Sequence, residues 1–164
     1  LVALVSGHQE KNRRGGTENV AGIVAFGAAC ELARSELPSH ARELTTLRDR
    51  LEAGVLRLPG TRRTVETHQR LPGTSHFCLS GVDGHSLVVA LDLEGVCVAS
   101  GPACSAGATE LSHVLTAGGV PPAWGQGALR VSLGWGSTGV DVDRFLAVLP
   151  GCLERLRAAA AEPA

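Results

Sequence analysis

Residues 129–134 read LRVSLG, an alternating stretch that predicts a β-strand over residues 128–133 with one apolar and one polar face. The aliphatic side chains share the apolar face, and Arg130 and Ser132 share the polar one. A guanidinium on the polar face of a strand can hold a carboxylate through two parallel hydrogen bonds. An ordinary exposed strand charge is the alternative, and the stretch alone leaves both interpretations open.

Two helices are predicted in the first third of the chain. The first begins at Val20 and ends or kinks at Pro38. Its many small residues predict close packing against another element. The side chains expected at that contact are Ile23, Phe26, Ala29, Cys30 and Ala33.

The second helix is expected to begin after Ser39 as its N-cap and to stop at residues 59–60, which are Pro-Gly. Apolar residues at three- and four-residue spacing form a stripe on its buried face, whereas Glu52 is expected on its solvent-exposed face. The members of the stripe are Leu44, Leu47, Leu51 and Val55.

The remaining elements complete a mixed order of short strands and helices. They are a polar connection over 61–73, strands over 76–80 and 95–99, helices over 87–91 and 109–115, a turn or helix from 121, and a last helix after Thr138 with a kink at Pro150. This order predicts an α+β fold, a small sheet with helices packed on one face.

The composition limits the possible functions. The chain has 164 residues, of which 44% are hydrophobic, enough for one compact domain or one domain plus a remnant of another. With 15 basic and 16 acidic residues and no basic block, nucleic acid and anionic membrane are poor partners. No signal peptide or membrane span is recognisable. The absence of Met and the start at Leu1 predict a piece of a longer polypeptide, or a processed start.

The five cysteines differ in their surroundings. Residues 99–108 read ASGPACSAGA and set Cys104 among small residues, where a thiol has access and the chain can move. A nucleophile and a buried small hydrophobe both remain open for Cys104 on this context. Cys30, Cys97 and Cys152 lie in apolar patterns and are expected to be buried. The odd count without tight pairs predicts a reducing cytoplasm and no metal site.

The loop at residues 9–19, QEKNRRGGTEN, is the third candidate. Its Gly-Gly-Thr sequence at 15–17 precedes a helix and can present backbone N–H groups and the Thr17 hydroxyl to a phosphate. An ordinary turn and helix cap is equally compatible, and the full nucleotide P-loop pattern is absent. The six histidines are scattered and are interpreted as surface or core residues.

Taken in order, three motifs resemble the C-terminal part of a cysteine desulfurase, a NifS-like enzyme of the class V aminotransferase family. They are the loop from Gln9 to Asn19, the segment SGPACS at 100–105 and the strand LRVSLG at 129–134. Two further stretches, LDLEG at 91–95 and SHVL at 112–115, also fit. The resemblance runs from about residue 6 to residue 157 and includes the order and spacing of the motifs.

The resemblance implies the small C-terminal domain of a fold-type I transferase that depends on pyridoxal phosphate. Residues 1–20 would be a remnant of the large cofactor-binding domain, and residues 21–164 the small domain with the cysteine loop at about 99–110. Cys104 would attack the sulfur of L-cysteine and carry it as a persulfide, with release of alanine. Arg130 would hold the substrate carboxylate, and Thr17 would reach the cofactor phosphate of the neighbouring subunit in a homodimer. The sulfur would pass to an acceptor or scaffold protein for iron–sulfur cluster or thio-cofactor assembly, and tRNA would be involved only indirectly, through thiolation.

The chain departs from the family pattern at several positions. Pro102 stands where the family usually has Ser, and His8 where it usually has Gly. The cofactor lysine lies in a Ser-x-His-Lys segment that this sequence lacks, and Lys11 occurs in a different motif. The 164-residue chain alone is therefore expected to be inactive. Selenocysteine lyase, or a non-catalytic fragment that dimerises or binds a partner, are the alternatives.

Overall fold

The computed structural model describes residues 2–64, 70–101 and 112–161, and the structural statements below concern these ranges. The chain divides into two compact units, residues 1–38 and 39–164. The expected domain division between residues 20 and 21 lies inside the first unit, and that division stays a prediction.

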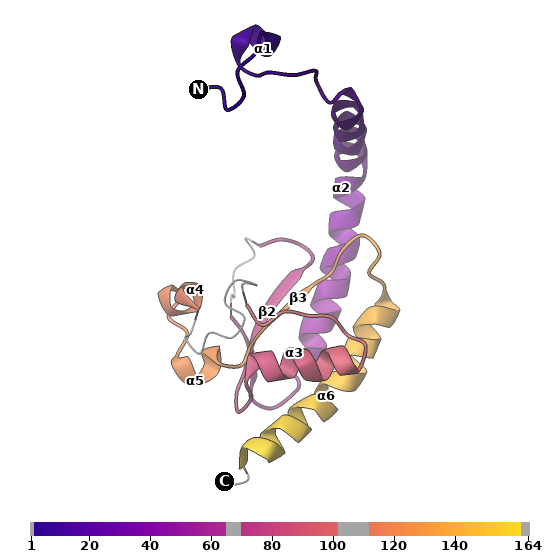
Figure 1. Cartoon of the computed structure of the whole chain (residues 1–164). Helices are drawn as coiled ribbons and strands as arrows, with labels where there is room; N and C mark the ends of the chain where they lie inside the picture. The colour runs from indigo at the N-terminus through magenta and orange to yellow at the C-terminus, as the bar shows by residue number, and fades with distance from the viewer. Residues whose placement is uncertain (1, 65–69, 102–111, 162–164) are drawn as a thin grey trace. The chain divides into compact units, whose positions relative to one another are not determined.

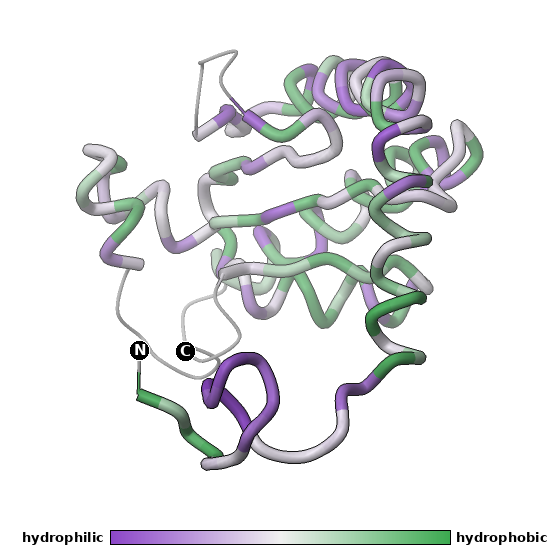
Figure 2. The backbone as a smooth tube through the Cα atoms, turned by 90° about the horizontal axis from the view of Figure 1, so that it is seen from above, coloured by the Kyte–Doolittle hydropathy of each residue, from purple (hydrophilic) through white to green (hydrophobic). Residues whose placement is uncertain are grey.

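The first unit begins with a tight polar turn, α1 (Gln9–Asn12), in which Glu10, Lys11 and Asn12 all have positive φ angles of 48°, 57° and 63°. Figure 2 shows this stretch as a hydrophilic loop. The turn is closed by a bridge between Gln9 and Arg14. A Cβ on Gly7 would lie 2.3 Å from the Cα of Gly15, so this close approach of two chain segments requires glycine.

Helix α2 (Val20–Val55) is continuous, although the sequence predicts two helices. Its first turn is capped by Asn19, whose Oδ1 accepts a hydrogen bond from the backbone N–H of Gly22 at 3.0 Å. Pro38 lies inside the helix, so the predicted N-cap at Ser39 is wrong. A proline removes one helical hydrogen bond, but the residues on either side supply enough bonding for the helix to continue.

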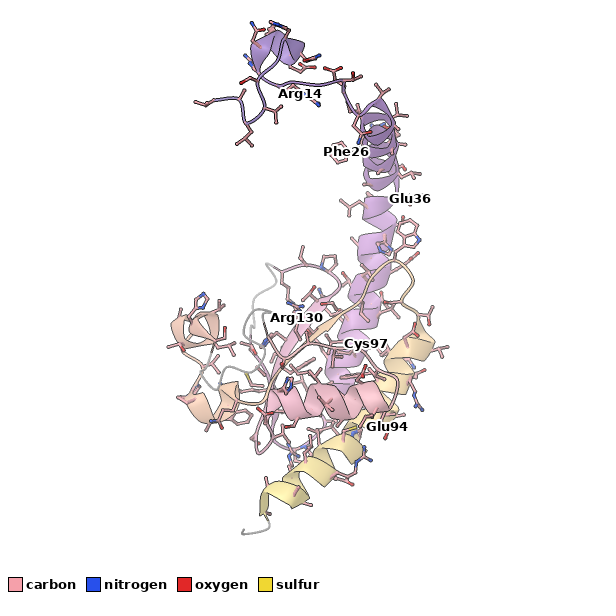
Figure 3. The ribbon with its side chains drawn as sticks, in the orientation of Figure 1. Arg14, Phe26, Glu36, Glu94, Cys97 and Arg130 are labelled. Carbon is pink, nitrogen blue, oxygen red and sulfur yellow. The ribbon has the colours of Figure 1, made fainter. Side chains whose placement is uncertain are left out.

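The apolar stripe at the start of α2 is exposed. Ile23 is 59% exposed and Phe26 is 73% exposed, and Figure 3 shows the Phe26 ring extending away from the helix. The expected packing of this stripe against another element is therefore not found among the described residues. Helical spacing identifies a face that suits burial, but it does not supply the surface that covers it.

The second unit contains a three-stranded antiparallel sheet in the order β1-β2-β3. Its strands are β1 (Thr61–Arg63), β2 (Thr74–Leu79) and β3 (Ala128–Ser132). The strand predicted at 128–133 is confirmed, with Leu129 and Val131 buried and Arg130 exposed.

Two predictions about this sheet are wrong. Residues 61–63, expected in a polar connection, form β1, because pairing with β2 satisfies their backbone groups. Residues 95–99, expected as a strand, contribute only one isolated bridge, between Ala99 and Arg130.

The helices of the second unit begin at recognisable caps. Helix α3 (Gly84–Leu93) is capped by Asp83, which accepts a hydrogen bond from the N–H of Ser86 at 2.8 Å. Helix α6 (Gly139–Ala161) follows Thr138, whose backbone N–H donates to Asp141 at 2.7 Å. Both starts agree with the sequence patterns. Two short helices, α4 (His113–Ala117) and α5 (Pro122–Gly125), precede β3.

The main core lies on one face of the sheet, where α2, α3 and α6 meet it; α3 and α6 pack side by side (Figure 1). Its largest fully buried side chains include Leu51, Phe77, Leu79, Leu87, Leu91, Leu129, Leu149 and Leu153. A smaller cluster around Cys78 and Leu115 involves α4 and lies on the other face. The α+β prediction is confirmed: a small three-stranded sheet has the larger helices packed on one face.

Candidate functional site

The polar face of the sheet is centred on Arg130 of β3. Its backbone is held on both sides, because β3 pairs with β2 and the Arg130 N–H also donates to the carbonyl of Ala99 at 2.6 Å. The side chain is exposed, and no described carboxylate forms an ion pair with it (Figure 3). Because its backbone is fixed and its guanidinium is exposed, Arg130 is suited to bind an anion from solution.

His76 lies directly opposite Arg130 in the pairing of β2 with β3. Its Nδ1 is 2.7 Å from the hydroxyl oxygen of Thr64, just after β1. Burial is the main cause that lowers the pKa of His76 below its ordinary value of 6.5, and the charge of Arg130 lowers it further. The sequence did not single out His76, because its neighbour across the sheet depends on the strand register.

Cys78 continues this polar row on β2 but is fully buried. Its Sγ is 3.2 Å from the Thr64 hydroxyl oxygen, so Thr64 bridges the side chains of His76 and Cys78. On its other side Cys78 packs with Leu115, Val120 and Ala128. The enclosed thiol is thus part of the wall of the site rather than an accessible group.

A second polar cluster stabilises the opposite face of the same sheet. Glu52, expected on the wet face of its helix, is only 3% exposed, so that prediction is wrong. Its carboxylate accepts hydrogen bonds from Ser75 at 2.6 Å, from Arg63 at 3.0 Å and from both terminal nitrogens of Arg70. Burial acts to raise the pKa of Glu52, but these hydrogen bonds and the charge of Arg70 outweigh it and lower the pKa to about 2.

Thr17 belongs to the first unit, whereas Arg130 belongs to the second. The Thr17 side chain is exposed, and the Thr17 carbonyl accepts a hydrogen bond from Arg14 at 3.4 Å. The neighbouring Gly16 has φ +79° and open space where a side chain would lie. The Thr17 hydroxyl and the adjacent backbone are therefore accessible to an anion, and a phosphate group such as that of pyridoxal phosphate would be compatible with them.

Pyridoxal phosphate is attached through a lysine, and this sequence has no lysine in a suitable motif. Lys11, the sole lysine, lies in the left-handed turn α1. The fit therefore concerns the phosphate alone.

Cys104 lies outside the described residues, as does the rest of the segment 102–111. The chain enters this segment from Ala99, whose N–H donates to the carbonyl of Arg130 at 3.1 Å. Among the other thiols, Cys152 is buried as expected and burial raises its pKa, whereas Cys30 and Cys97 are exposed, contrary to expectation. The apolar neighbours of Cys30 on α2 are exposed with it, whereas Val96 and Val98, on either side of Cys97, pack partly against the main core.

A groove of about 370 Å³ lies elsewhere in the second unit, between α2 and the turn that leads from β3 to α6. It is lined in part by His40 and Trp135, whose ring centroids are 4.9 Å apart. It contains none of the site residues predicted from the sequence, so the polar sheet face remains the candidate site.

Metal binding and membrane insertion find no support in the described ranges. No three His, Cys, Asp or Glu side chains are grouped there as metal ligands. None of the helices there combines the length and apolarity needed to cross a bilayer.

The chain is similar to known proteins over nearly its whole length. The chain is 42% identical over 152 residues to a cysteine desulfurase of Gluconacetobacter diazotrophicus. This match covers 92% of the chain and 38% of the relative. It is 44% identical over 154 residues to the cysteine desulfurase IscS of Methanosarcina thermophila, with 94% and 38% covered. The chain thus spans about two fifths of the length of these relatives.

Solved structures give the same result. A NifS-like protein of Rickettsia africae matches with a TM-score of 0.79 and 28% identity, covering 93% of this chain and 40% of that one. A second NifS-like protein matches with a TM-score of 0.79 and 33% identity, covering 94% and 39%. The aminotransferase class-V family itself matches residues 4–145, and the chain therefore belongs to that family.

Proposed function

We propose that this chain forms the C-terminal part of a pyridoxal phosphate-dependent cysteine desulfurase, which moves sulfur from L-cysteine to Cys104 and releases alanine. The observation that carries the proposal is Arg130, an exposed guanidinium on a fixed strand position with no carboxylate partner among the described side chains. Relatives named cysteine desulfurase, 40–44% identical over 92–94% of the chain, support it.

Arg130 binds the substrate carboxylate in this proposal. A planar guanidinium can donate two parallel hydrogen bonds to a carboxylate, and such charge-assisted bonds contribute roughly 1.5–3 kcal/mol each. The pairing of Arg130 with both β2 and Ala99 fixes the base of its side chain, which reduces the entropy lost when the substrate binds.

Cys104 acts as the nucleophile. Its thiolate attacks the substrate sulfur, so that a sulfur–sulfur bond forms as the carbon–sulfur bond breaks. The bonding electrons remain on the carbon fragment, which takes up a proton and leaves as alanine, while Cys104 retains the persulfide. Pyridoxal phosphate, when bound, withdraws electrons from the substrate carbon skeleton.

Thr17 donates a hydrogen bond to the cofactor phosphate, and this contact comes from the neighbouring subunit of a homodimer. The exposed hydroxyl and the open space beside Gly16 support this assignment. Residues 1–20 then belong to the large cofactor-binding domain and residues 21–164 to the small one. The persulfide sulfur passes to an acceptor or scaffold protein in the cytoplasm, for iron–sulfur cluster or thio-cofactor assembly.

The test uses the full-length protein. Cys104→Ser should abolish alanine release and protein persulfide while the visible absorption of the bound cofactor remains. Arg130→Lys should raise KM for L-cysteine about 10- to 100-fold, because the two-bond geometry is lost. Alanine is measured by chromatography and the persulfide by mass spectrometry.

Cys97→Ser is the matched control, because Cys97 is exposed, lies shortly before Cys104 in the sequence and has no proposed role. It should retain full activity. Persulfide formation in Cys104→Ser, or on Cys97 in the wild type, would overturn the assignment. A higher turnover of selenocysteine than of cysteine would favour selenocysteine lyase instead.

A further inference from the structure

The polar face of β2 holds a histidine that the proposed reaction does not use. His76 stands opposite Arg130 in the strand register, so their side chains leave the sheet on the same face and at the same level. The ring is more deeply enclosed than Arg130, whose side chain is exposed.

Thr64 holds the His76 ring in place. Its hydroxyl oxygen is 2.7 Å from Nδ1 of His76 and 3.2 Å from Sγ of Cys78. The backbone contributes as well, because the N–H of Thr64 donates to the carbonyl of His76 at 2.9 Å. With Nδ1 engaged, the other ring nitrogen, Nε2, is the one that exchanges its proton with the surroundings.

We propose that His76 is a positioning residue for Arg130 that takes up a proton when a carboxylate binds to the guanidinium. This inference rests on the proposed function of Arg130 as the carboxylate anchor. The proton comes from the solvent and is returned when the carboxylate leaves, so no other reactant is needed.

The physical reason is the balance of charge on this face. In the free site Arg130 carries a full positive charge beside the ring, which disfavours a second positive charge on His76. A bound carboxylate cancels that charge and removes the repulsion, so the protonated ring becomes easier to form. By reciprocity, a protonated His76 strengthens carboxylate binding.

The other titratable groups near His76 do not change this balance. Cys78 lies on the same strand and is enclosed, and Arg62 faces the same side from β1. The Arg62 guanidinium lies over the Trp124 ring of α5, with Cζ 4.6 Å from the ring centroid, so a cation–π contact engages its charge. Among the described residues, Arg130 is the charge that lowers the pKa of His76.

The proposal predicts a pH effect on substrate affinity. As the pH falls through the range in which His76 gains its proton, binding of a carboxylate should become tighter. Above that range the neutral ring leaves Arg130 as the single cation of the pair, and affinity should reach a lower plateau.

The experiment follows the His76 ring by NMR in the full-length protein with 13C-labelled histidine, using L-alanine as the carboxylate probe. The His76 resonance is assigned from its loss in His76→Asn. Saturating L-alanine should raise the pKa of His76 by about one unit. The resonance of His85, which is exposed on α3, serves as an internal reference and should not respond.

Variants of Arg130 distinguish the role of Arg130 as carboxylate anchor from the role of His76 as proton acceptor. Arg130→Gln should raise the pKa of His76 in the free protein and abolish its response to alanine, whereas Arg130→Lys should keep the pKa of the free protein near the wild-type value. Calorimetry measures alanine affinity in parallel, and His76→Asn should bind alanine with an affinity that no longer improves toward low pH.

The possible outcomes are distinct. If Arg130→Gln binds alanine as tightly as the wild type, the proposed carboxylate anchor is wrong. If Arg130→Gln loses affinity but the pKa of His76 is the same with and without alanine, the anchor stands and the role of His76 is overturned.

Discussion

The two faces of the sheet use the same three strands for different purposes. On one face Phe77, Leu79 and Leu129 are fully buried against the main helices. On the other, His76 and Arg130 lie opposite each other, and a smaller apolar cluster around Cys78 and Leu115 covers part of the same face. Because side chains alternate along a strand, the burial that fixes one face also fixes the register of the other. The chemical face can therefore remain polar without loss of order.

Removal of a core side chain should have the largest effect on stability. Phe77→Ala should lower the free energy of unfolding by about 3–5 kcal/mol, because it leaves a cavity at the centre of the apolar face. Urea denaturation measures the loss. Phe77→Leu is the milder control and should cost about 1 kcal/mol.

The matched variant on the other face is Arg130→Gln. Its side chain is exposed, so the free energy of unfolding should change by no more than about 0.5 kcal/mol. An Arg130→Gln loss equal to that of Phe77→Ala would mean that the polar face contributes to stability as much as the apolar one does.

Glu52 should give the next largest effect, and one that depends on pH. Glu52→Gln should cost about 3 kcal/mol at neutral pH, because the buried hydrogen bonds from Arg63, Arg70 and Ser75 lose their charged acceptor. Gln has nearly the same volume as Glu, so the loss reports the charge rather than a cavity.

The sign of the pH dependence follows from the lowered pKa of Glu52. Its ordinary value is 4.5 and its value in the folded protein is about 2, so its contribution is complete above 4.5 and is lost as the pH falls toward 2. Over that interval the wild type should lose on the order of 3 kcal/mol more than Glu52→Gln. Parallel stability curves for the two proteins would contradict the assignment of Glu52.

The sequence was most informative where a local pattern decided the outcome. The alternation around Arg130 and the helix start after Thr138 were predicted, because each depends on neighbouring residues. The buried state of Glu52 was not predicted. Its partners lie 11 to 23 residues away and meet it only after β1 and β2 have paired.

The same distinction applies to the candidate site. Arg130 was identified from its strand pattern, whereas His76 and Thr64 were missed because their meeting depends on the register of two strand pairs. The helical stripe before Pro38 shows the converse limit. Its spacing predicted burial of Phe26, which is exposed among the described residues, because spacing does not specify a covering surface.

A smaller loss of stability than in Phe77→Ala or Glu52→Gln is expected when the hydroxyl that supports the polar face is removed. Thr64→Val keeps the volume but removes the hydroxyl shared by His76 and Cys78, and it should lower the free energy of unfolding by about 1 kcal/mol. Thr64→Ser retains the hydroxyl and should cost less than about 0.5 kcal/mol. Urea denaturation compares the two, and the 15N shifts of the His76 ring report whether its tautomer changes only in Thr64→Val. A loss in Thr64→Val as large as that in Phe77→Ala would show that the polar face, too, holds the fold together, and the division of labour between the faces would fail.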